Sequence, residues 1–156
     1  MSESPIYHVG IVVEDIDAAM AQLTAATGIT WAPVQRDLAV HYGRSGGDEV
    51  DWISSFVYSR EMPHIELLQQ KDGTIWEKPG FHHLGLWRED VDASSREIEQ
   101  RGCTWEVAMV DEEGTRLGGC YHWLDAAFAR VELTSLTRSK PRLERYLAGE
   151  DYFSEG

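Results

Sequence analysis

The strongest constraint on this chain is a segment that occurs twice. Residues 7–18 read YHVGIVVEDIDA, and residues 82–93 read HHLGLWREDVDA. A second pair follows, PHIELL at 63–68 and ARVELT at 129–134. Internal similarity of this kind indicates that one structural unit is repeated. The sequence therefore predicts two similar halves, each with a histidine near its start and a glutamate near its end.

Hydrophobic periodicity predicts how each half begins. An apolar strand over 6–13 precedes Asp15, which can cap a helix whose apolar positions recur with the helical period until Gly28. The second half has the same order, with a strand over 82–88 and a helix capped by Asp90. Three further strands are predicted in each half, at 31–41, 50–59, 63–69, 104–110, 117–124 and 128–136. Each half is then a βαβββ unit.

These units organise residues 1–156 as a single domain. We expect a first module over 5–70, a linker over 71–80, a second module over 81–137 and a tail over 138–156 that begins with a short helix. A chain of this length buries roughly 70% of its unfolded surface, so it needs no disulfide framework. The glycine-rich stretch near 43–49 is expected to be a hairpin loop that could act as a flexible lid.

The acidic composition excludes some classes of partner. The formal net charge is −13, which repels a nucleic-acid backbone. Cys103 and Cys120 lack the spacing of metal-binding cysteines, and no apolar run is long enough to span a membrane. We therefore expect a soluble cytoplasmic protein with reduced thiols, whose partner is a small molecule rather than nucleic acid or a membrane.

Glu66 and Glu132 are unusual because each lies inside an apolar run, IELL and VEL. An ionised carboxylate buried there without a partner would cost several kcal/mol, and a divalent cation would supply the compensating charge. His8 and His83, on the opening strands, would complete a mixed nitrogen and oxygen shell. Taken singly, a strand glutamate can face water and a histidine can be structural. Their recurrence at equivalent positions favours one metal site shared by both halves.

These motifs resemble those of the vicinal oxygen chelate superfamily, which includes glyoxalase I, methylmalonyl-CoA epimerase, extradiol dioxygenases and bleomycin-resistance proteins. The openings at 8–19 and 83–86 look like the family's first strand and helix, and 65–68 and 131–133 look like its ligand-bearing closing strands. The resemblance covers nearly the whole chain. It implies an α+β fold in which two βαβββ modules form a curved mixed sheet, shaped as a cup around one divalent metal ion.

The resemblance also implies that the metal ligands are His8, Glu66, His83 and Glu132. Repeat alignment selects His83 over His82, whose side chain is expected on the opposite face of the strand. Methylmalonyl-CoA epimerases usually have Gln at the position of Glu66, so the ligand set is more similar to bacterial glyoxalase I. The helix-opening phrase that serves glutathione in glyoxalase I has no counterpart here. Histidine and glutamate serve Zn, Mn, Co, Ni and Fe alike, so the metal and the substrate stay open.

Two imidazoles and two carboxylates leave about two positions of an octahedral ion for substrate oxygens. We therefore expect a metal-dependent isomerase, epimerase or lyase that moves a proton next to the chelated carbonyl of a small, partly hydrophobic substrate. Glu132 is the first candidate for the catalytic base and Glu66 is the second. His64 shares a strand face with Glu66, so it is a possible proton shuttle or a residue that orients the carboxylate.

Two other functions remain open from the sequence alone. One is a non-haem iron dioxygenase, although that chemistry usually uses a single carboxylate ligand. The other is a protein that sequesters a drug or metabolite without chemistry, although such an apolar trap has no use for buried carboxylates. We expect a homodimer with each site built in one chain.

Residues that could line the cup can be listed only by type. Strand aromatics are the candidates, with plain core packing as the alternative: Trp52, Phe56, Tyr58, Trp87, Trp105, Tyr121 and Trp123. His41 and His122 have no repeat partner, so we expect them to be structural or on the surface. Substrate identity should depend on 37–52 and 109–123, where the two halves differ.

Overall fold

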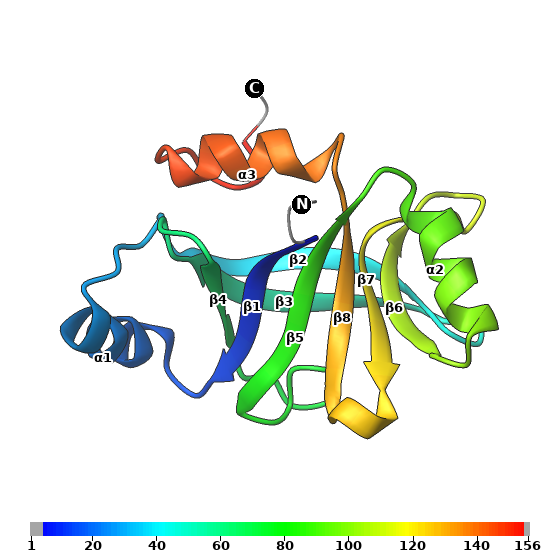
Figure 1. The fold of residues 1–156 in the computed structure, drawn as a ribbon, viewed down its shortest axis with the longest axis horizontal. Helices are drawn as coiled ribbons and strands as arrows, with labels where there is room; N and C mark the ends of the chain where they lie inside the picture. The colour runs from blue at the N-terminus through cyan, green and yellow to red at the C-terminus, as the bar shows by residue number, and fades with distance from the viewer. Residues whose placement is uncertain (1–4, 155–156) are drawn as a thin grey trace.

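The computed structural model describes residues 5–154, and this part of the chain contains eight strands and three α-helices (Figure 1). The first module contains β1 (Ile6–Val13), α1 (Ile16–Thr27), β2 (Gln35–Arg44), β3 (Glu49–Tyr58) and β4 (His64–Gln69). The second contains β5 (Gly80–Arg88), α2 (Val91–Gln100), β6 (Trp105–Val110), β7 (Arg116–Leu124) and β8 (Ala129–Ser135), with a 3-10 turn at Asp125–Ala127; α3 (Ser139–Leu147) follows. The predicted α+β fold of two βαβββ units is confirmed.

The strands form one closed, mixed sheet in the order β1-β4-β3-β2-β6-β7-β8-β5. In each module the first strand pairs in parallel with the last, β1 with β4 and β5 with β8, and the other pairs are antiparallel. The modules meet where β1 pairs with β5 and where β2 pairs with β6. This order places the His-bearing and Glu-bearing strands of both modules side by side, in the sequence β4, β1, β5, β8.

The helices begin where the sequence predicts. The side chain of Asp15 accepts a hydrogen bond from Ala18 N, and that of Asp90 accepts one from Ala93 N, so both carboxylates cap a helix N-terminus. Gly28 ends α1 in the left-handed conformation, at φ 77°. None of the described helices is long and apolar enough to cross a membrane.

One strand differs from the expectation. The strand predicted over 31–41 is found at Gln35–Arg44, because Pro33 has no N–H for a ladder and Trp31 forms only an isolated bridge with Ser59. At its other end β2 continues through Gly43 and Arg44, which pair with β6 of the second module. The loop expected at 43–49 is thereby reduced to a turn between β2 and β3.

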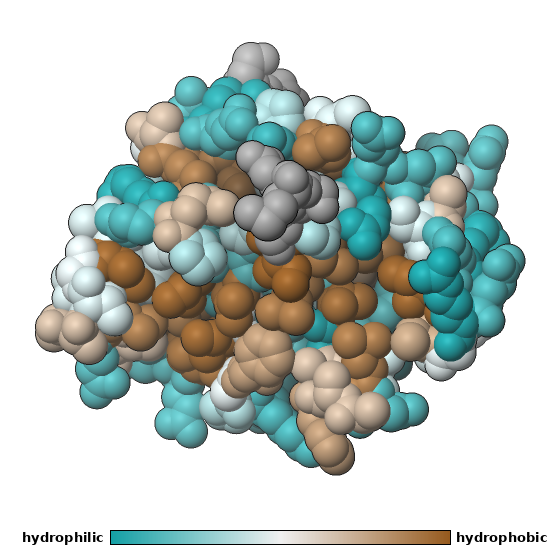
Figure 2. All heavy atoms as spheres, viewed as in Figure 1, coloured by the Kyte–Doolittle hydropathy of each residue, from teal (hydrophilic) through white to brown (hydrophobic). Residues whose placement is uncertain are grey.

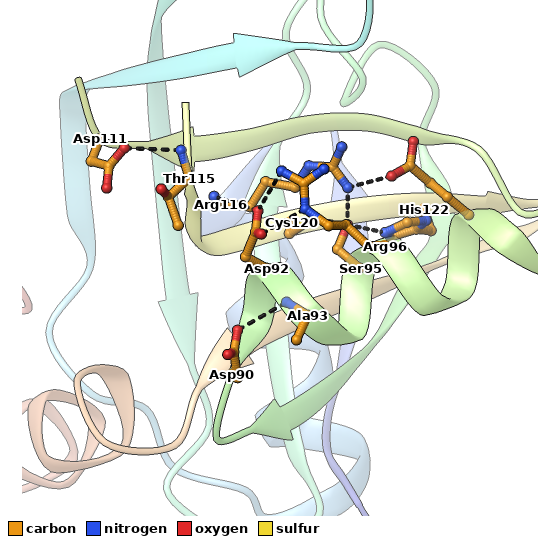
Figure 3. Close-up of polar contacts among 11 residues, drawn as sticks. Asp90, Asp92, Ala93, Ser95, Arg96, Asp111, Thr115, Arg116, Cys120 and His122 are labelled. Carbon is orange, nitrogen blue, oxygen red and sulfur yellow. Dashed lines mark hydrogen bonds and ion pairs between the residues drawn. The ribbon is translucent and has the colours of Figure 1, made fainter. Parts of the chain in front are cut away.

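A buried polar network attaches α2 to β7 (Figure 3). Arg116 donates a hydrogen bond to Ser95 Oγ at 2.7 Å, and Ser95 Oγ lies 2.7 Å from His122 Nε2. Nδ1 of His122 lies 2.9 Å from the carbonyl oxygen of Cys103, so the ring proton is on Nδ1 and Ser95 donates to Nε2. Because Ser95 and His122 are fully buried, we assign this pair to structure and not to nucleophilic catalysis.

The outer face of the central strands is apolar between the two helices. Ile65, Val9, Leu84 and Val131 are neighbours in register across β4, β1, β5 and β8, so they share one face of the sheet. Ile65 packs in the cluster that contains α1, and Val131 packs in the cluster that contains α2. Val9 and Leu84 lie between them and are only half-buried, and Figure 2 shows brown, apolar side chains over this region.

Candidate metal centre

The register of the four central strands brings the predicted ligands together. Gly10 is the register partner of both Glu66 and His83, and Gly85 is the register partner of both His8 and Glu132. Residues opposite one another on neighbouring strands point to the same face. Two short rows thus lie side by side on the inner face, each with a glycine between a carboxylate and an imidazole.

The glycines make room for the histidines of the opposite module. A Cβ atom on Gly10 would overlap the ring of His83, and one on Gly85 would overlap the ring of His8. Both imidazoles are fully buried, and each lies over the other module's opening strand. The repeated His-X-Gly spacing is therefore a packing requirement of the site.

Four ligand-type atoms converge within one chain. The Nε2 atoms of His8 and His83 lie 2.8 Å apart. Glu66 Oε2 lies 3.1 Å from each of these nitrogens, and Glu132 Oε2 lies 3.1 Å from His8 and 3.0 Å from His83. All four atoms lie within 4.8 Å of one another, and all four residues are buried. The structure thus brings together every residue that the sequence predicts as a metal ligand.

The electrostatics of this cluster demand a positive charge. Burial alone would raise the pKa of Glu66 and of Glu132. The neighbouring His8 and His83 lower it by more, so the pKa of both carboxyls lies below the ordinary value. Burial lowers the pKa of His8, yet the two carboxylates outweigh it and raise this pKa to about 9. Two ionised carboxylates are therefore buried together, and either protons on the imidazoles or a divalent cation must compensate them.

The donor set fits a divalent cation. Glu132 Oε2 is buried and has no hydrogen bond from any described residue, although two ring nitrogens lie close to it. The four ligand-type atoms form six pairs, and in five of these pairs the two atoms lie 2.8–3.1 Å apart. Adjacent ligands around an octahedral ion with bonds of about 2.1 Å are about 3.0 Å apart. His8, Glu66, His83 and Glu132 would together hold such a cation, which would supply Lewis-acid chemistry to a ligand in the adjoining cavity.

The sequence did not predict that His82 supports His83. The Nδ1 atoms of the two rings lie 2.8 Å apart, and His82 Nε2 lies 2.8 Å from the carbonyl oxygen of Ile75. A carbonyl oxygen only accepts, so His82 Nε2 donates to Ile75 and Nδ1 of neutral His82 is an acceptor. His83 therefore donates from Nδ1, which leaves the lone pair of its Nε2 free for a cation. The His82 side chain lines a pocket outside the cup with Trp123 and Arg130, and it also contacts the His83 ring.

The carboxylates open into a cavity of about 60 Å³. Three of the predicted strand aromatics line it, Phe56, Tyr58 and Tyr121, and the other four do not. Tyr58 is in register with Glu66, and Tyr121 is in register with Glu132, so each carboxylate has an equivalent tyrosine beside it. The full lining is Val40, Tyr42, Ser54, Phe56, Tyr58, Glu66, Leu68, Trp76, Met109, Gly119, Tyr121, Glu132, Tyr152 and Phe153.

Part of this lining comes from segments that the sequence did not assign to the cup. Trp76 belongs to the expected linker, and Tyr152 and Phe153 belong to the expected tail. The aromatic rings of all three were visible in the sequence, but no repeat or periodicity connects them to the site. The turn after Arg44, considered as a lid, contributes no residue to the cavity.

The remaining histidines lie apart from the four-residue cluster. His64 is the register partner of His8, but its Nδ1 lies 2.8 Å from the carbonyl oxygen of Ser59 and its side chain lines a different pocket, beneath α3. His41 is exposed and pairs with Asp51 on the neighbouring strand. His122 belongs to the buried network under α2, as expected for a structural residue.

Comparison with known families agrees with this geometry. The model of the glyoxalase/bleomycin resistance protein/dioxygenase superfamily matches residues 7–121, so the chain belongs to this superfamily. The resemblance to the vicinal oxygen chelate proteins is thereby confirmed. No curated protein sequence matches the chain.

Solved structures share the fold at low sequence identity. A methylmalonyl-CoA epimerase in complex with methylmalonyl-CoA and NH4+ is 17% identical, with a TM-score of 0.57 over 86% of this chain and 95% of that chain. Methylmalonyl-CoA epimerase from Mycobacterium tuberculosis is 18% identical, with a TM-score of 0.55 over 86% and 91%. A hypothetical protein from Bacillus halodurans is 12% identical, with a TM-score of 0.57 over 83% and 92%. These likenesses concern the fold.

Proposed function

We propose that the chain is a metal-dependent enzyme that transfers a proton next to a carbonyl group, as an isomerase, epimerase or lyase. The observation that carries this proposal is the convergence of His8, Glu66, His83 and Glu132, two of which, Glu66 and Glu132, line a cavity. These four residues would hold one divalent cation of the Zn, Mn, Co, Ni or Fe group. When bound, the cation supplies Lewis-acid stabilisation of negative charge on a carbonyl oxygen, worth several kcal/mol.

The protein's own groups move the proton. The C–H bond next to the carbonyl breaks, its proton passes to a carboxylate oxygen, and its electron pair moves toward the carbonyl group. Glu132 and Glu66 both line the cavity, so both are within reach of a substrate there, whereas His64 lines another pocket. We propose Glu132 as the first candidate for the base and Glu66 as the second, in the order that the sequence leads us to expect, since the Oε2 atoms of both lie 3.0–3.1 Å from the ring nitrogens of His8 and His83.

The proposal predicts metal-dependent exchange of carbon-bound hydrogen with solvent. Hydroxyacetone is a suitable probe, because it is small, has adjacent carbonyl and hydroxyl oxygens, and carries exchangeable hydrogens between them. The protein loaded with Zn²⁺, Mn²⁺, Co²⁺, Ni²⁺ or Fe²⁺ in D₂O should remove the CH₂ signal in the proton NMR spectrum faster than the free ion does. The metal-free protein should not.

The same samples separate the rival functions. Oxygen consumption that requires Fe²⁺ would favour a dioxygenase, and binding of hydroxyacetone without exchange would favour a sequestering protein. Elemental analysis of gently purified protein that finds no stoichiometric divalent metal, together with failure to bind any of the five added ions, would refute the metal site itself.

His82 provides a test of metal binding that needs no substrate. The variant His82→Phe removes the acceptor for His83 Nδ1, and loss of such a supporting bond typically weakens metal affinity by about 10- to 100-fold. The matched variant His82→Gln can accept from His83 and donate to Ile75, so it should retain most of the affinity. Competition with a chromophoric zinc chelator measures both. Parental affinity in His82→Phe would show that His83 needs no such support.

We also propose the homodimer that the sequence leads us to expect. The apolar row centred on Val9 and Leu84 is a surface on which a second copy could pack, because it lies uncovered between α1 and α2. The site itself is built from one chain. Light scattering on the purified protein measures the mass of the assembly, and a monomer at micromolar concentration would contradict the dimer.

A further inference from the structure

A second pocket adjoins the cavity of the metal centre. Its volume is about 250 Å³, and its lining is Met109, Leu117, Arg138, Ser139, Arg142 and Phe153. Met109 and Phe153 also line the cavity of the metal centre, so the two spaces share a wall. The pocket lies against the start of α3, which follows β8, the strand that carries Glu132 (Figure 1). We call this space the α3 pocket.

The charged side chains of the α3 pocket are both cations. Arg138 and Arg142 line it, and none of the described residues that line it is an aspartate or a glutamate. Neither guanidinium forms a hydrogen bond or an ion pair with a described residue. Acidic residues outnumber basic ones by 27 to 14 in this chain, so carboxylates are plentiful. Two arginines that share a pocket without one are therefore positioned for an anion that the chain does not supply.

The start of α3 adds to this positive charge. Arg138 is its N-cap residue, no side chain caps the helix, and the first turn contains no acidic residue. The N–H groups at a helix N-terminus carry partial positive charge, so they favour anions and disfavour cations. The position of Arg138 is thus unfavourable within the chain alone, and a bound anion would make it favourable.

A buried hydroxyl independently indicates a ligand in the α3 pocket. Ser139 is only 8% exposed, and its Oγ has no hydrogen-bond partner among the described residues. This oxygen is not one of the unpaired atoms that are shielded from solvent, so a ligand in the pocket can reach it. A serine hydroxyl can donate to an oxyanion, as the two guanidinium groups can.

Arg142 is held at the wall between the two spaces. Its guanidinium carbon lies 5.1 Å from the ring centroid of Phe153 and 5.7 Å from that of Tyr152. Both rings line the cavity of the metal centre. A cation–π contact positions a guanidinium without using its N–H groups, so those of Arg142 stay available to an anion.

We propose that the α3 pocket binds an anionic group of the substrate, a phosphate or a carboxylate, through Arg138, Arg142 and Ser139. The reacting carbon of the same substrate then lies in the cavity of the metal centre, and Met109 and Phe153 contact the carbon atoms between the two ends. This inference rests on the proposed function, since it names the substrate class of that site. The net charge of −13 repels anions in general, and the two arginines offset it at this one place.

Three probes that share a phenyl ring test the pocket in metal-free protein. Phenyl phosphate and benzoate carry an oxyanion, and benzyl alcohol is uncharged. In a ligand-observed NMR titration we expect one of the anions to bind at least about tenfold more tightly than benzyl alcohol, because guanidinium groups form charge-assisted hydrogen bonds with it. The tighter of the two anions identifies the group that the pocket accepts. Equal binding of all three probes, or tightest binding of benzyl alcohol, would overturn the proposal.

Variants of α3 assign the anion to the pocket. Arg142→Gln should weaken binding of the preferred anion by about tenfold and leave benzyl alcohol unchanged, and Ser139→Ala should weaken the same anion by a smaller factor. Arg145→Gln is the matched control, because it removes the same charge from the same helix, whereas Arg145 pairs with Glu150 and does not line the pocket. It should bind the anion as the parent does. Parental binding by both Arg142→Gln and Ser139→Ala would refute the assigned contacts.

A paramagnetic ion tests whether the pocket and the metal centre serve one substrate. With Mn²⁺ kept below the protein concentration, the NMR signals of bound phenyl phosphate should broaden, and Arg142→Gln should remove most of this broadening. Binding of the anion without broadening by bound Mn²⁺ would overturn the shared substrate. Failure of Mn²⁺ to bind would contradict the proposed function alone, because the titrations on metal-free protein decide the anion pocket separately.

Discussion

Gly85→Ala is expected to abolish tight binding of a divalent cation while the protein remains folded. Gly85 lies opposite His8 on one neighbouring strand and opposite Glu132 on the other, and an added methyl group would overlap the His8 ring. The ring must then leave its position, because a packed interior cannot absorb the overlap for less than about 1–3 kcal/mol. Affinity for Zn²⁺ should fall by at least about 100-fold, which is more than the loss expected when a residue that only supports a ligand, such as His82, is replaced. Gly10→Ala should do the same through His83.

A matched glycine in the same sheet separates loss of the site from loss of the fold. A Cβ on Gly118, in β7, would meet the Met109 side chain at 3.5 Å, which is an ordinary contact. Gly118→Ala should therefore bind Zn²⁺ as the parent does, and circular dichroism should show both variants folded. Parental zinc affinity in Gly85→Ala would mean that the His8 ring is not where the metal is held.

The ligand set was predictable because it is repeated and lies on strands. A strand alternates its faces, so once the repeat aligned His8 with His83 and Glu66 with Glu132, the faces of all four residues followed. The glycine spacing was visible too, but its purpose depends on register across β1 and β5, which the sequence does not specify.

The substrate-facing residues were less predictable for a physical reason. Trp76 reaches the cavity from the linker and Tyr152 from the tail, and neither segment has a period that reveals which face it covers. His82 was expected on the opposite face of β5, and it does line an outer pocket. Its contact with His83 depends on ring orientation and on the position of the Ile75 carbonyl, neither of which has a sequence pattern.

Glu132→Gln is expected to slow the metal-dependent exchange of hydroxyacetone hydrogens by about 10²- to 10⁴-fold, the usual contribution of a positioned general base. The amide keeps an oxygen that can face the cation but cannot accept the substrate's proton. Because removal of one charge weakens metal binding, the rate is measured at saturating Zn²⁺ with bound metal determined in the same sample. Unchanged exchange with the metal retained would remove Glu132 as the base.

Glu66→Gln completes the comparison, because the two carboxylates occupy equivalent positions in the two modules. Tyr58 lies beside Glu66 as Tyr121 lies beside Glu132, so local surroundings alone do not favour either residue. The Oε2 atoms of the two carboxylates also lie at nearly the same distances from the ring nitrogens of His8 and His83, 3.1 Å at Glu66 and 3.0–3.1 Å at Glu132. With Glu132 as the proposed base, a smaller loss is expected in Glu66→Gln. Equal losses would mean that one carboxylate removes a proton and the other returns one, as an epimerisation requires, and a larger loss in Glu66→Gln would exchange the two roles.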